Sequence, residues 1–392
     1  MLCSEEKCTG CMSCYNICPK DAIQIVEDKE GFKRPIIIKE KCIECKLCDK
    51  RCPILNNFKT KKLDKKLVYA CWAKDKSIRF NSTSGGVSST ISEWVIDEKG
   101  FVFGAAFDKD FDLNHICIED KESLSKIRGS KYVQSNISDS YKKVRKKLIE
   151  GKIVLFTGTP CQIDGLNTYL NKEYTNLITI DILCHGVPSP KVFKSYLNYL
   201  EEKKKSKINS VNFRYKKPGW YFYSMKIKFD NNKQYIRNNR CDIYHRGFLR
   251  DYFLRPACHK CKYTNIDRVG DITLADFWGY TSECEADIND DKGISLCIVN
   301  SKKGEKIFNQ VKDKLIVFER NLEEAIAANA AFSKNTKENS RRDEFWRDYN
   351  KSFKITIKKY LFPDKIGIKE SFFVYTTYET RKKIKKFFRL KR

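Results

Sequence analysis

Short apolar runs alternate with amphipathic stretches through the middle of the chain. Residues 152–156 form a brief apolar run, which is followed by the loop 157–161 and a helical pattern. Residues 177–183 repeat the arrangement, with the loop 184–188 and a second helical pattern behind them. This alternation predicts a parallel or mixed sheet covered by helices. Ligands bind such sheets beyond the carboxyl ends of the strands, where both loops are expected.

Further elements are predicted on both sides of these units by the same periodicities. We expect strands at 22–26, 35–38, 67–72 and 101–107, helices at 87–96 and 138–150, a polar glycine turn at 81–86, an antiparallel excursion at 210–236, and helices from 320 onward. Cys71, Cys117 and Cys297 lie in apolar strand patterns and are expected in the core. The patterns predict a fold of mixed α+β and α/β class.

One cysteine pattern near the start occurs twice. Cys8, Cys11, Cys14 and Cys18-Pro19 are repeated as Cys42, Cys45, Cys48 and Cys52-Pro53, each displaced by 34 positions (42 − 8 = 34). A C-x2-C-x2-C-x3-C-P run is the bacterial ferredoxin signature, in which the fourth cysteine binds the neighbouring cluster. We therefore assign Cys8, Cys11, Cys14 and Cys52 to one [4Fe-4S] cluster, and Cys42, Cys45, Cys48 and Cys18 to a second.

Zinc binding and disulfide formation fit this repeat less well. A zinc site needs only four ligands, so the third cysteine of each run and the Cys-Pro ending would have no role in it. Disulfides between cysteines so closely spaced would close small, strained loops. Iron–sulfur binding is the interpretation that uses every cysteine of the repeat.

A second group of cysteines is less regular. Cys161 and Cys184 lie in the two loops at the predicted sheet edge, and Cys258 and Cys261 form a C-x2-C pair. Four soft ligands are enough for one cube or for one zinc ion, and spacing alone does not choose between them.

The residues around this group resemble one family. The resemblance is carried by 157–162 (TGTPCQ), 184–189 (CHGVPS), 258–263 (CHKCKY), 271–279 (DITLADFWG), 82–86 (STSGG) and 129–135 (GSKYVQS). It is to the beta subunit of coenzyme F420-reducing hydrogenase and its dehydrogenase relatives, and it covers about residues 67 to 300. The repeat at the start resembles the dicluster module that is fused to part of that family.

The resemblance implies a flavoprotein that holds FAD beside a third [4Fe-4S] cluster. The cluster ligands would be Cys161, Cys184, Cys258 and Cys261. The implied cofactor-binding residues are Ser84, Gly85, Gly86, Lys131, Tyr132, Gln134, Thr157, Gly158 and Thr159. The family pattern usually has glycine where this chain has Ala275, which puts a close backbone approach to a ligand there in doubt. From the residues alone, the 82–86 segment is compatible with a phosphate site at a helix N-terminus, but an ordinary helix cap is the favoured interpretation.

Composition indicates the cellular compartment and the kind of partner. The 392 residues carry 18 cysteines and a formal charge of +27, and the N-terminus lacks the apolar stretch of a secretory signal. We expect reduced thiols, a cytoplasmic protein and an acidic redox partner such as ferredoxin. The sequence lacks the zinc-finger histidines and the ordered aromatic–basic repeats of nucleic-acid-binding modules, so no nucleic-acid partner is expected. The basic segment 381–392 suggests peripheral contact with anionic lipid or with an acidic protein, and a disordered tail is an equal alternative.

Four regions follow from these patterns: a dicluster ferredoxin domain at 1–56, the two parts of a flavin-binding domain at 67–150 and 151–319, and a helical basic extension at 320–392. We expect an oxidoreductase that passes electrons between ferredoxin or a deazaflavin coenzyme and an unidentified substrate, through [4Fe-4S] clusters and FAD. Its catalytic residues and oligomeric state are not indicated. The alternative is a non-enzymatic electron-transfer subunit of a larger complex.

Overall fold

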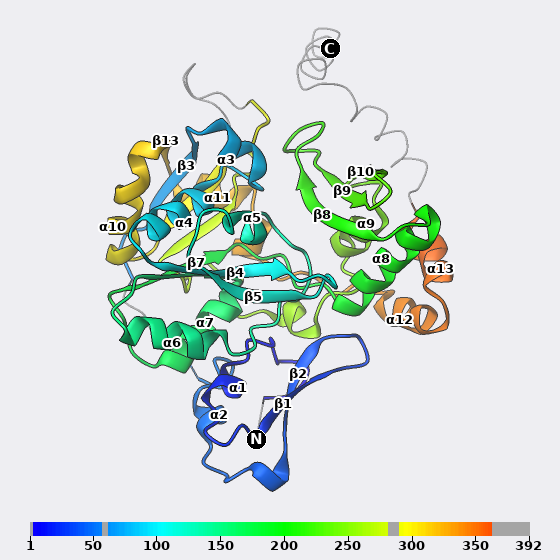
Figure 1. Ribbon diagram of the computed structural model, residues 1–392, viewed down its shortest axis with the longest axis horizontal. Helices are drawn as coiled ribbons and strands as arrows, with labels where there is room; N and C mark the ends of the chain where they lie inside the picture. Colours follow the sequence, from blue (N-terminus) through cyan, green and yellow to red (C-terminus); the bar gives the residue numbers. More distant parts are fainter. Residues whose placement is uncertain (1–2, 57–61, 281–289, 363–392) are drawn as a thin grey trace.

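The computed structural model describes residues 3–56, 62–280 and 290–362. Eight of its strands form one large mixed sheet (Figure 1). They are β3 (Leu67–Ala73), β4 (Phe101–Phe107), β5 (Leu113–Ile118), β6 (Val154–Gly158), β7 (Leu177–Ile182), β11 (Ile272–Asp276), β12 (Ser295–Val299) and β13 (Leu315–Arg320). Their order is β13-β3-β12-β11-β7-β6-β4-β5. The central β4, β6, β7 and β11 are parallel, and the other pairings are antiparallel. The expected mixed α/β class is confirmed.

Helices cover both faces of this sheet, which explains why its strands are apolar at successive positions. One face packs on α4 (Val87–Asp97) and α10 (Lys302–Val311), and the other packs on α6 (Ser140–Ile149) and α7 (Pro160–Leu170). In β6, Leu155 belongs to the first of these cores, whereas Val154 and Phe156 belong to the second. Within the described residues, no helix is long and apolar enough to cross a membrane.

Cys71 and Cys297 are fully buried in the sheet, as expected, but Cys117 is exposed. The expectation for Cys117 was wrong because β5 is the last strand of the sheet and leaves part of its surface uncovered. Two short helices, α3 (Lys76–Asn81) and α5 (Leu124–Ile127), were also not predicted.

A second lobe lies to one side of the large sheet (Figure 1). Its elements are α8 (Pro190–Lys204), β8 (Ile208–Tyr215), β9 (Ser224–Phe229), β10 (Gln234–Asn238), α9 (Ile243–Leu249), α12 (Arg342–Lys351), α13 (Phe353–Thr356) and the π-helical turn η5 (Ile357–Leu361). The three strands are antiparallel, which confirms the expected excursion. Along the chain, η3 (Lys312–Lys314) joins α10 to β13, and α11 (Leu322–Ala327) and η4 (Ala330–Phe332) follow β13. The basic segment 381–392 lies outside the described residues.

The N-terminal segment forms a small module at the end of the molecule below α6 and α7 (Figure 1). It contains α1 (Ser13–Ile17), β1 (Ile23–Glu27), β2 (Lys33–Ile37), η1 (Lys39–Lys41) and α2 (Leu47–Lys50). The backbone conformation of the module repeats at the same spacing as its cysteines. Gly10 and Met12 have φ of 71° and 62°, and Glu44 and Lys46, each 34 positions later, have φ of 53° and 58°. Left-handed conformation at both pairs shows that the two cysteine loops share one shape.

Candidate functional site

The first thiol group lies where the module meets the large sheet. Cys8 and Cys11 precede α1, Cys14 lies on it, and Cys52 follows α2, and all four line one cavity. Cys8, Cys11 and Cys14 are buried. The structure therefore brings together three cysteines of the first run and one of the second, the set assigned to one cube. Cys3 lines the same cavity, and the spacing of the repeat gave no reason to include it.

The second thiol group has the complementary composition. Cys18, Cys42, Cys45 and Cys48 line one cavity, three from the second run and one from the first. Cys45 is exposed, whereas none of the first four is. The module thus presents one thiol group to solvent and the other to the body of the molecule.

A third cavity collects the remaining proposed ligands. Cys161 lies in the first turn of α7, Cys184 follows β7, and Cys258 and Cys261 belong to and follow the turn η2 (Pro256–Lys260). The backbone N–H of Val187 donates to Cys258 Sγ at 3.4 Å. Four residues from three separate segments therefore surround one cavity, as the resemblance implied.

The donor sets fit iron–sulfur cubes chemically, because at least four thiols line each cavity. In the described part of the chain, no three His, Cys, Asp or Glu side chains are grouped closely enough to hold a single metal ion. Each thiol set surrounds a cavity instead.

A fourth, large cavity of about 320 Å³ opens at the carboxyl ends of the parallel strands. Eight of the nine residues implied as cofactor contacts line it: Ser84, Gly86, Lys131, Tyr132, Gln134, Thr157, Gly158 and Thr159. It also extends between residues of the module and of β11, including Gly10 and Asp276. A cavity of this size with a few convergent polar groups is suited to a cofactor.

Gly85 does not line this cavity. A Cβ at position 85 would lie 2.3 Å from the carbonyl oxygen of Cys71 and 2.9 Å from the backbone nitrogen of Ser295. The Gly85 N–H donates to Ser295 Oγ at 2.9 Å. This glycine therefore fixes the loop against β3 and β12, so that its neighbours Ser84 and Gly86 face the cavity.

Gln134 and Tyr132 line the cavity and also form hydrogen bonds with other residues. Gln134 Oε1 accepts from the Lys33 N–H at 2.8 Å, and Gln134 Nε2 donates to the Lys33 carbonyl at 3.3 Å. Arg214 Nη1 donates to the Tyr132 hydroxyl at 3.0 Å. The Gln134 side chain thus joins the body to the module.

Burial shifts the pKa of two titratable groups in the cavity wall. Lys131 Nζ donates to the carbonyls of Arg128 at 3.1 Å and Gly129 at 3.2 Å, and burial lowers the pKa of Lys131 to about 7. Burial also lowers the pKa of His115 to about 4, so this ring is neutral near pH 7. His115 was not expected at the site because β5 was not predicted.

Three of the four cavities share residues, and the second thiol cavity is separate from them. Thr9 lines the first thiol cavity, the third thiol cavity and the large cavity. Cys161, Thr159 and Val187 line the third thiol cavity and the large cavity. The Thr9 hydroxyl is buried and has no hydrogen-bond partner among the described residues. Thr9 and Gly10 stand between Cys8 and Cys11, and their role was missed because cysteine spacing says nothing of what packs against the loop.

Comparisons with known proteins found three family models that match the chain. The family model "Coenzyme F420 hydrogenase/dehydrogenase, beta subunit N-term" matches residues 68–142, and the corresponding C-terminus model matches residues 151–325. The model "4Fe-4S dicluster domain" matches residues 7–55.

Similar proteins were found among curated sequences and solved structures. A coenzyme F420-dependent sulfite reductase of Methanocaldococcus jannaschii is 26% identical over 315 residues, which are 78% of this chain and 46% of that protein. The chain thus spans about half the length of this relative. An uncharacterised ferredoxin of the same organism is 38% identical over 63 residues, which are 15% of this chain and 80% of the ferredoxin. A chain of the F420-reducing [NiFe] hydrogenase complex from Methanosarcina barkeri has a TM-score of 0.48 at 14% identity, covering 76% of this chain and 96% of that one.

Proposed function

The chain belongs to the coenzyme F420 hydrogenase/dehydrogenase beta-subunit family and carries a 4Fe-4S dicluster domain at its N-terminus, and we propose that it is an iron–sulfur flavoprotein oxidoreductase. It exchanges electrons between a ferredoxin-like partner or a deazaflavin coenzyme and a substrate that is not yet identified. The proposed thiolate ligands require a reducing compartment, which favours the cytoplasm.

The observation that carries this proposal is the adjacency of the cavities. Cys161 borders both the third thiol cavity and the large cavity, and Thr9 borders these two and the first thiol cavity. Groups held in the first cavity, the third cavity and the large cavity would therefore be neighbours. A cluster exchanges single electrons, whereas a reduced flavin can deliver a hydride, so the pairing converts one kind of transfer into the other.

The residues of this chain have distinct tasks in the proposal. The twelve cysteines of the three groups hold the clusters. Lys131, beside the loop of Ser84 and Gly86, supplies a cation and the loop supplies hydroxyl groups for the phosphates of FAD. Thr159 forms a capping box with Gln162 and fixes the start of α7, which in turn positions Cys161.

The choice of partner follows from the relative and from charge. The curated relative is named as dependent on coenzyme F420, and a deazaflavin is a hydride carrier that the large cavity could serve. The formal charge of +27 favours an acidic protein such as ferredoxin as the alternative electron donor.

Cofactor content tests the proposal directly. The chain, purified without oxygen, is expected to contain about twelve irons, as many sulfides and one flavin. About eight irons per chain would contradict the third cluster. A protein without flavin would contradict the proposed hydride transfer. Reduction by deazaflavin coenzyme, nicotinamide and ferredoxin would then identify the donor.

Substitution of one ligand separates the third cluster from the other two. Cys258→Ser is expected to lower iron by about four per chain and to leave the signals of the two module clusters unchanged. Cys117→Ser is the control, because this exposed thiol lies on β5 and belongs to none of the three groups. Equal iron in the two variants would contradict the assignment of Cys258.

A second candidate function has one observation in its favour. The chain spans 46% of the length of the sulfite reductase relative, so the reaction on the final substrate could belong to a separate partner. In that case the chain would be a non-enzymatic electron-transfer subunit. It would be reduced by its donor but would pass electrons on only when the partner is added.

A further inference from the structure

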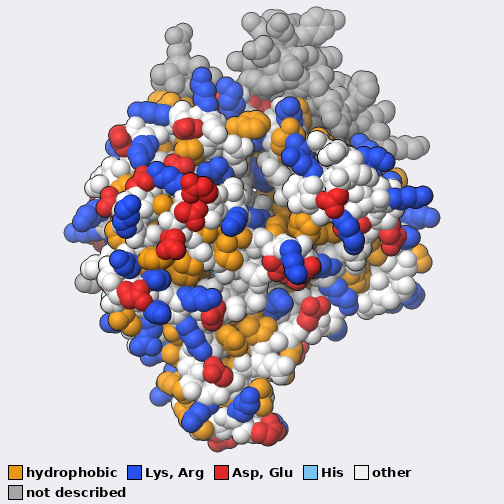
Figure 2. Space-filling model, in the orientation of Figure 1, with side chains coloured by type: hydrophobic (Ala, Val, Ile, Leu, Met, Phe, Trp, Pro, Cys, Tyr) orange, Lys and Arg blue, Asp and Glu red, His pale blue; other side chains and the backbone are white. Residues whose placement is uncertain are grey.

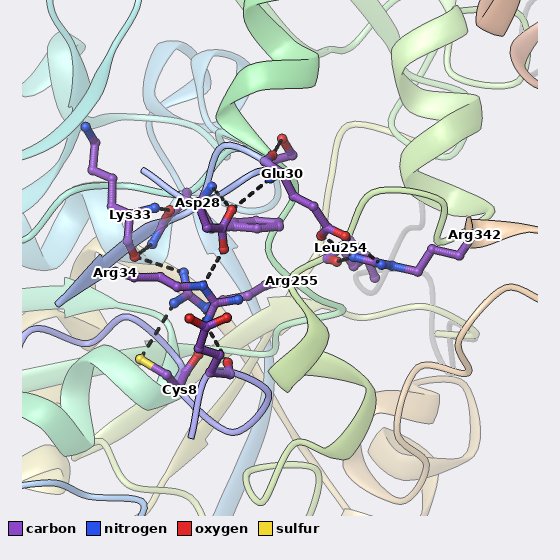
Figure 3. Close-up of polar contacts among 12 residues, drawn as sticks. Cys8, Asp28, Glu30, Lys33, Arg34, Leu254, Arg255 and Arg342 are labelled. Atoms are coloured by element: carbon purple, nitrogen blue, oxygen red, sulfur yellow. Dashed lines mark hydrogen bonds and ion pairs between the residues drawn. The ribbon is translucent and has the colours of Figure 1, made fainter. Parts of the chain in front are cut away.

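A single buried arginine connects the module to the body of the molecule. Arg255 precedes η2 and is 1% exposed. Its Nε donates to the Cys8 carbonyl at 2.7 Å, its Nη1 to the Lys33 carbonyl at 3.2 Å, and its Nη2 to Cys8 Sγ at 3.7 Å (Figure 3). All three guanidinium nitrogens are therefore engaged with the module.

The backbone of Arg255 belongs to the other side of the junction. Its N–H donates to the Val187 carbonyl at 2.9 Å, and its carbonyl accepts from the Cys258 N–H at 2.9 Å. One residue thus joins the loop of Cys8 to the loop of Cys258. Gly10 makes this approach possible, because a Cβ there would lie 2.8 Å from Arg255 Nη1.

Arg255 differs from the other arginines of the junction in its charge partners. Arg34 pairs with Asp28, and Arg342 pairs with Glu30 through two nitrogens (Figure 3). Within the described residues, Arg255 forms no ion pair with a carboxylate. A buried cation is costly unless an anion faces it. A cluster bound by thiolates would provide such an anion, and the ligand sulfur of Cys8 is already in contact.

We propose that Arg255 is a positioning residue that raises the reduction potential of the cluster held by Cys8, Cys11, Cys14 and Cys52 above that of the other module cluster. This inference rests on the proposed iron–sulfur function and extends it. Each reduction adds one electron, and hence one negative charge, to the cluster. A desolvated guanidinium in contact with a ligand sulfur stabilises that added charge.

The second thiol cavity has a different environment. Lys20 and Lys46 line it, but both are exposed, and water and salt screen their charge. The cluster of the first thiol group is therefore expected to have the higher reduction potential of the two module clusters, because of Arg255.

The test is a potentiometric titration of the anaerobically purified full chain, followed by electron paramagnetic resonance, with dithionite as reductant. Arg255→Gln is expected to retain its iron. The equilibrium constant for reduction of one module cluster should fall about tenfold, which lowers its reduction potential by 59 mV for a one-electron step. The reduction potential of the other module cluster should not change. Arg255→Lys keeps the charge but loses the planar fork, so the same couple should fall by less.

Arg342→Gln is the matched control for loss of docking. Arg342 Nη2 donates to the Leu254 carbonyl at 3.0 Å, and its ion pair with Glu30 holds the tip of the β1–β2 hairpin. No contact of Arg342 with a cysteine occurs in the described residues. Its loss should weaken the attachment of the hairpin and leave both potentials unchanged.

Unchanged potentials in an Arg255→Gln protein with full iron would overturn the proposal, and so would an equal shift in Arg342→Gln. If the glutamine variant loses iron, the neutral Arg255→Met variant decides, and potentials equal to wild type in that variant would overturn the proposal. Failure of the proposed function is separate, since it would show in the unsubstituted protein as missing flavin or iron.

Discussion

Lys131 places an amine in the wall of the large cavity, with two backbone carbonyls as its only acceptors among the described residues. Burial without a carboxylate partner lowers its pKa to about 7, so the free amine is partly neutral at physiological pH. A bound phosphate would restore the charged form, because an opposite charge at short range favours the ammonium ion. His115 nearby is neutral above its pKa of about 4 and does not compete for this role.

This coupling predicts how FAD affinity depends on pH. Below pH 7 the lysine is already charged and affinity should be constant. Above pH 7 binding must take up a proton, so affinity should fall by up to about tenfold per pH unit. The dissociation constant of FAD, measured by flavin fluorescence on the apoflavoprotein across this range, reports the effect.

Lys131→Arg is the control, since arginine stays protonated throughout. Its FAD affinity should be independent of pH over the same range. If both proteins weaken equally with pH, then Lys131 is not the group that titrates.

At the scale of elements, α7 organises the junction. Its first turn carries Cys161, and its middle packs on the module, where Gly165 faces Cys11. Glycine in the middle of a helix costs roughly 0.5–1 kcal/mol relative to alanine, so helix propensity alone predicts that Gly165→Ala stabilises the protein.

The structure predicts the opposite. A Cβ at Gly165 would lie 2.8 Å from Cys11 Cβ and 2.9 Å from the Tyr141 hydroxyl. Overpacking of this kind costs about 1–3 kcal/mol. We expect Gly165→Ala to lower the free energy of unfolding in urea and to release module iron at lower denaturant concentration.

Gly151→Ala provides the comparison, because its Cβ would meet nothing within 4 Å and only its φ of 74° opposes the change. It is expected to lower stability through backbone strain, by about 1–2 kcal/mol, without early release of iron. A Gly165→Ala protein more stable than wild type would show that the module does not pack on α7 in this way.

Sequence patterns predicted those elements near the site that have a local signal, whereas β5 and β11 were not predicted. The β6–α7 unit was recognisable from an apolar run followed by Thr159-Pro160, a helix start. The ligand sets of the module followed from one repeat. Thr9 and Arg255 could not be predicted, because their roles depend on contacts between segments far apart in the chain. Gly85 was assigned to the cofactor for its place in the loop, whereas its need for small size comes from β3 and β12.

At the scale of the whole molecule, the three thiol cavities and the large cavity run from an exposed end to a buried one. Cys45 is exposed in the second cavity, and the first cavity is buried against the body. Basic side chains are spread over the face shown in Figure 2, and acidic ones lie among them. The net charge of +27 therefore attracts an anionic partner to the molecule generally, and the location of productive docking is a separate question.

The exposed thiol cavity predicts where an acidic ferredoxin docks. Lys20 and Lys46 line that cavity, Lys50 lies on α2 beside it, and all three are exposed. Changing them together to glutamate should lower the second-order rate constant for reduction by ferredoxin about tenfold at low salt, measured by stopped flow. The difference should shrink as ionic strength rises, since exposed charges are screened over about 8–10 Å.

The same change at Lys126, Lys203 and Lys205, which are exposed and lie far along the chain from the module, alters net charge equally and should have a much smaller effect. Equal losses in the two triple variants would mean that overall charge sets the rate and that electrons do not enter at the Cys45 end.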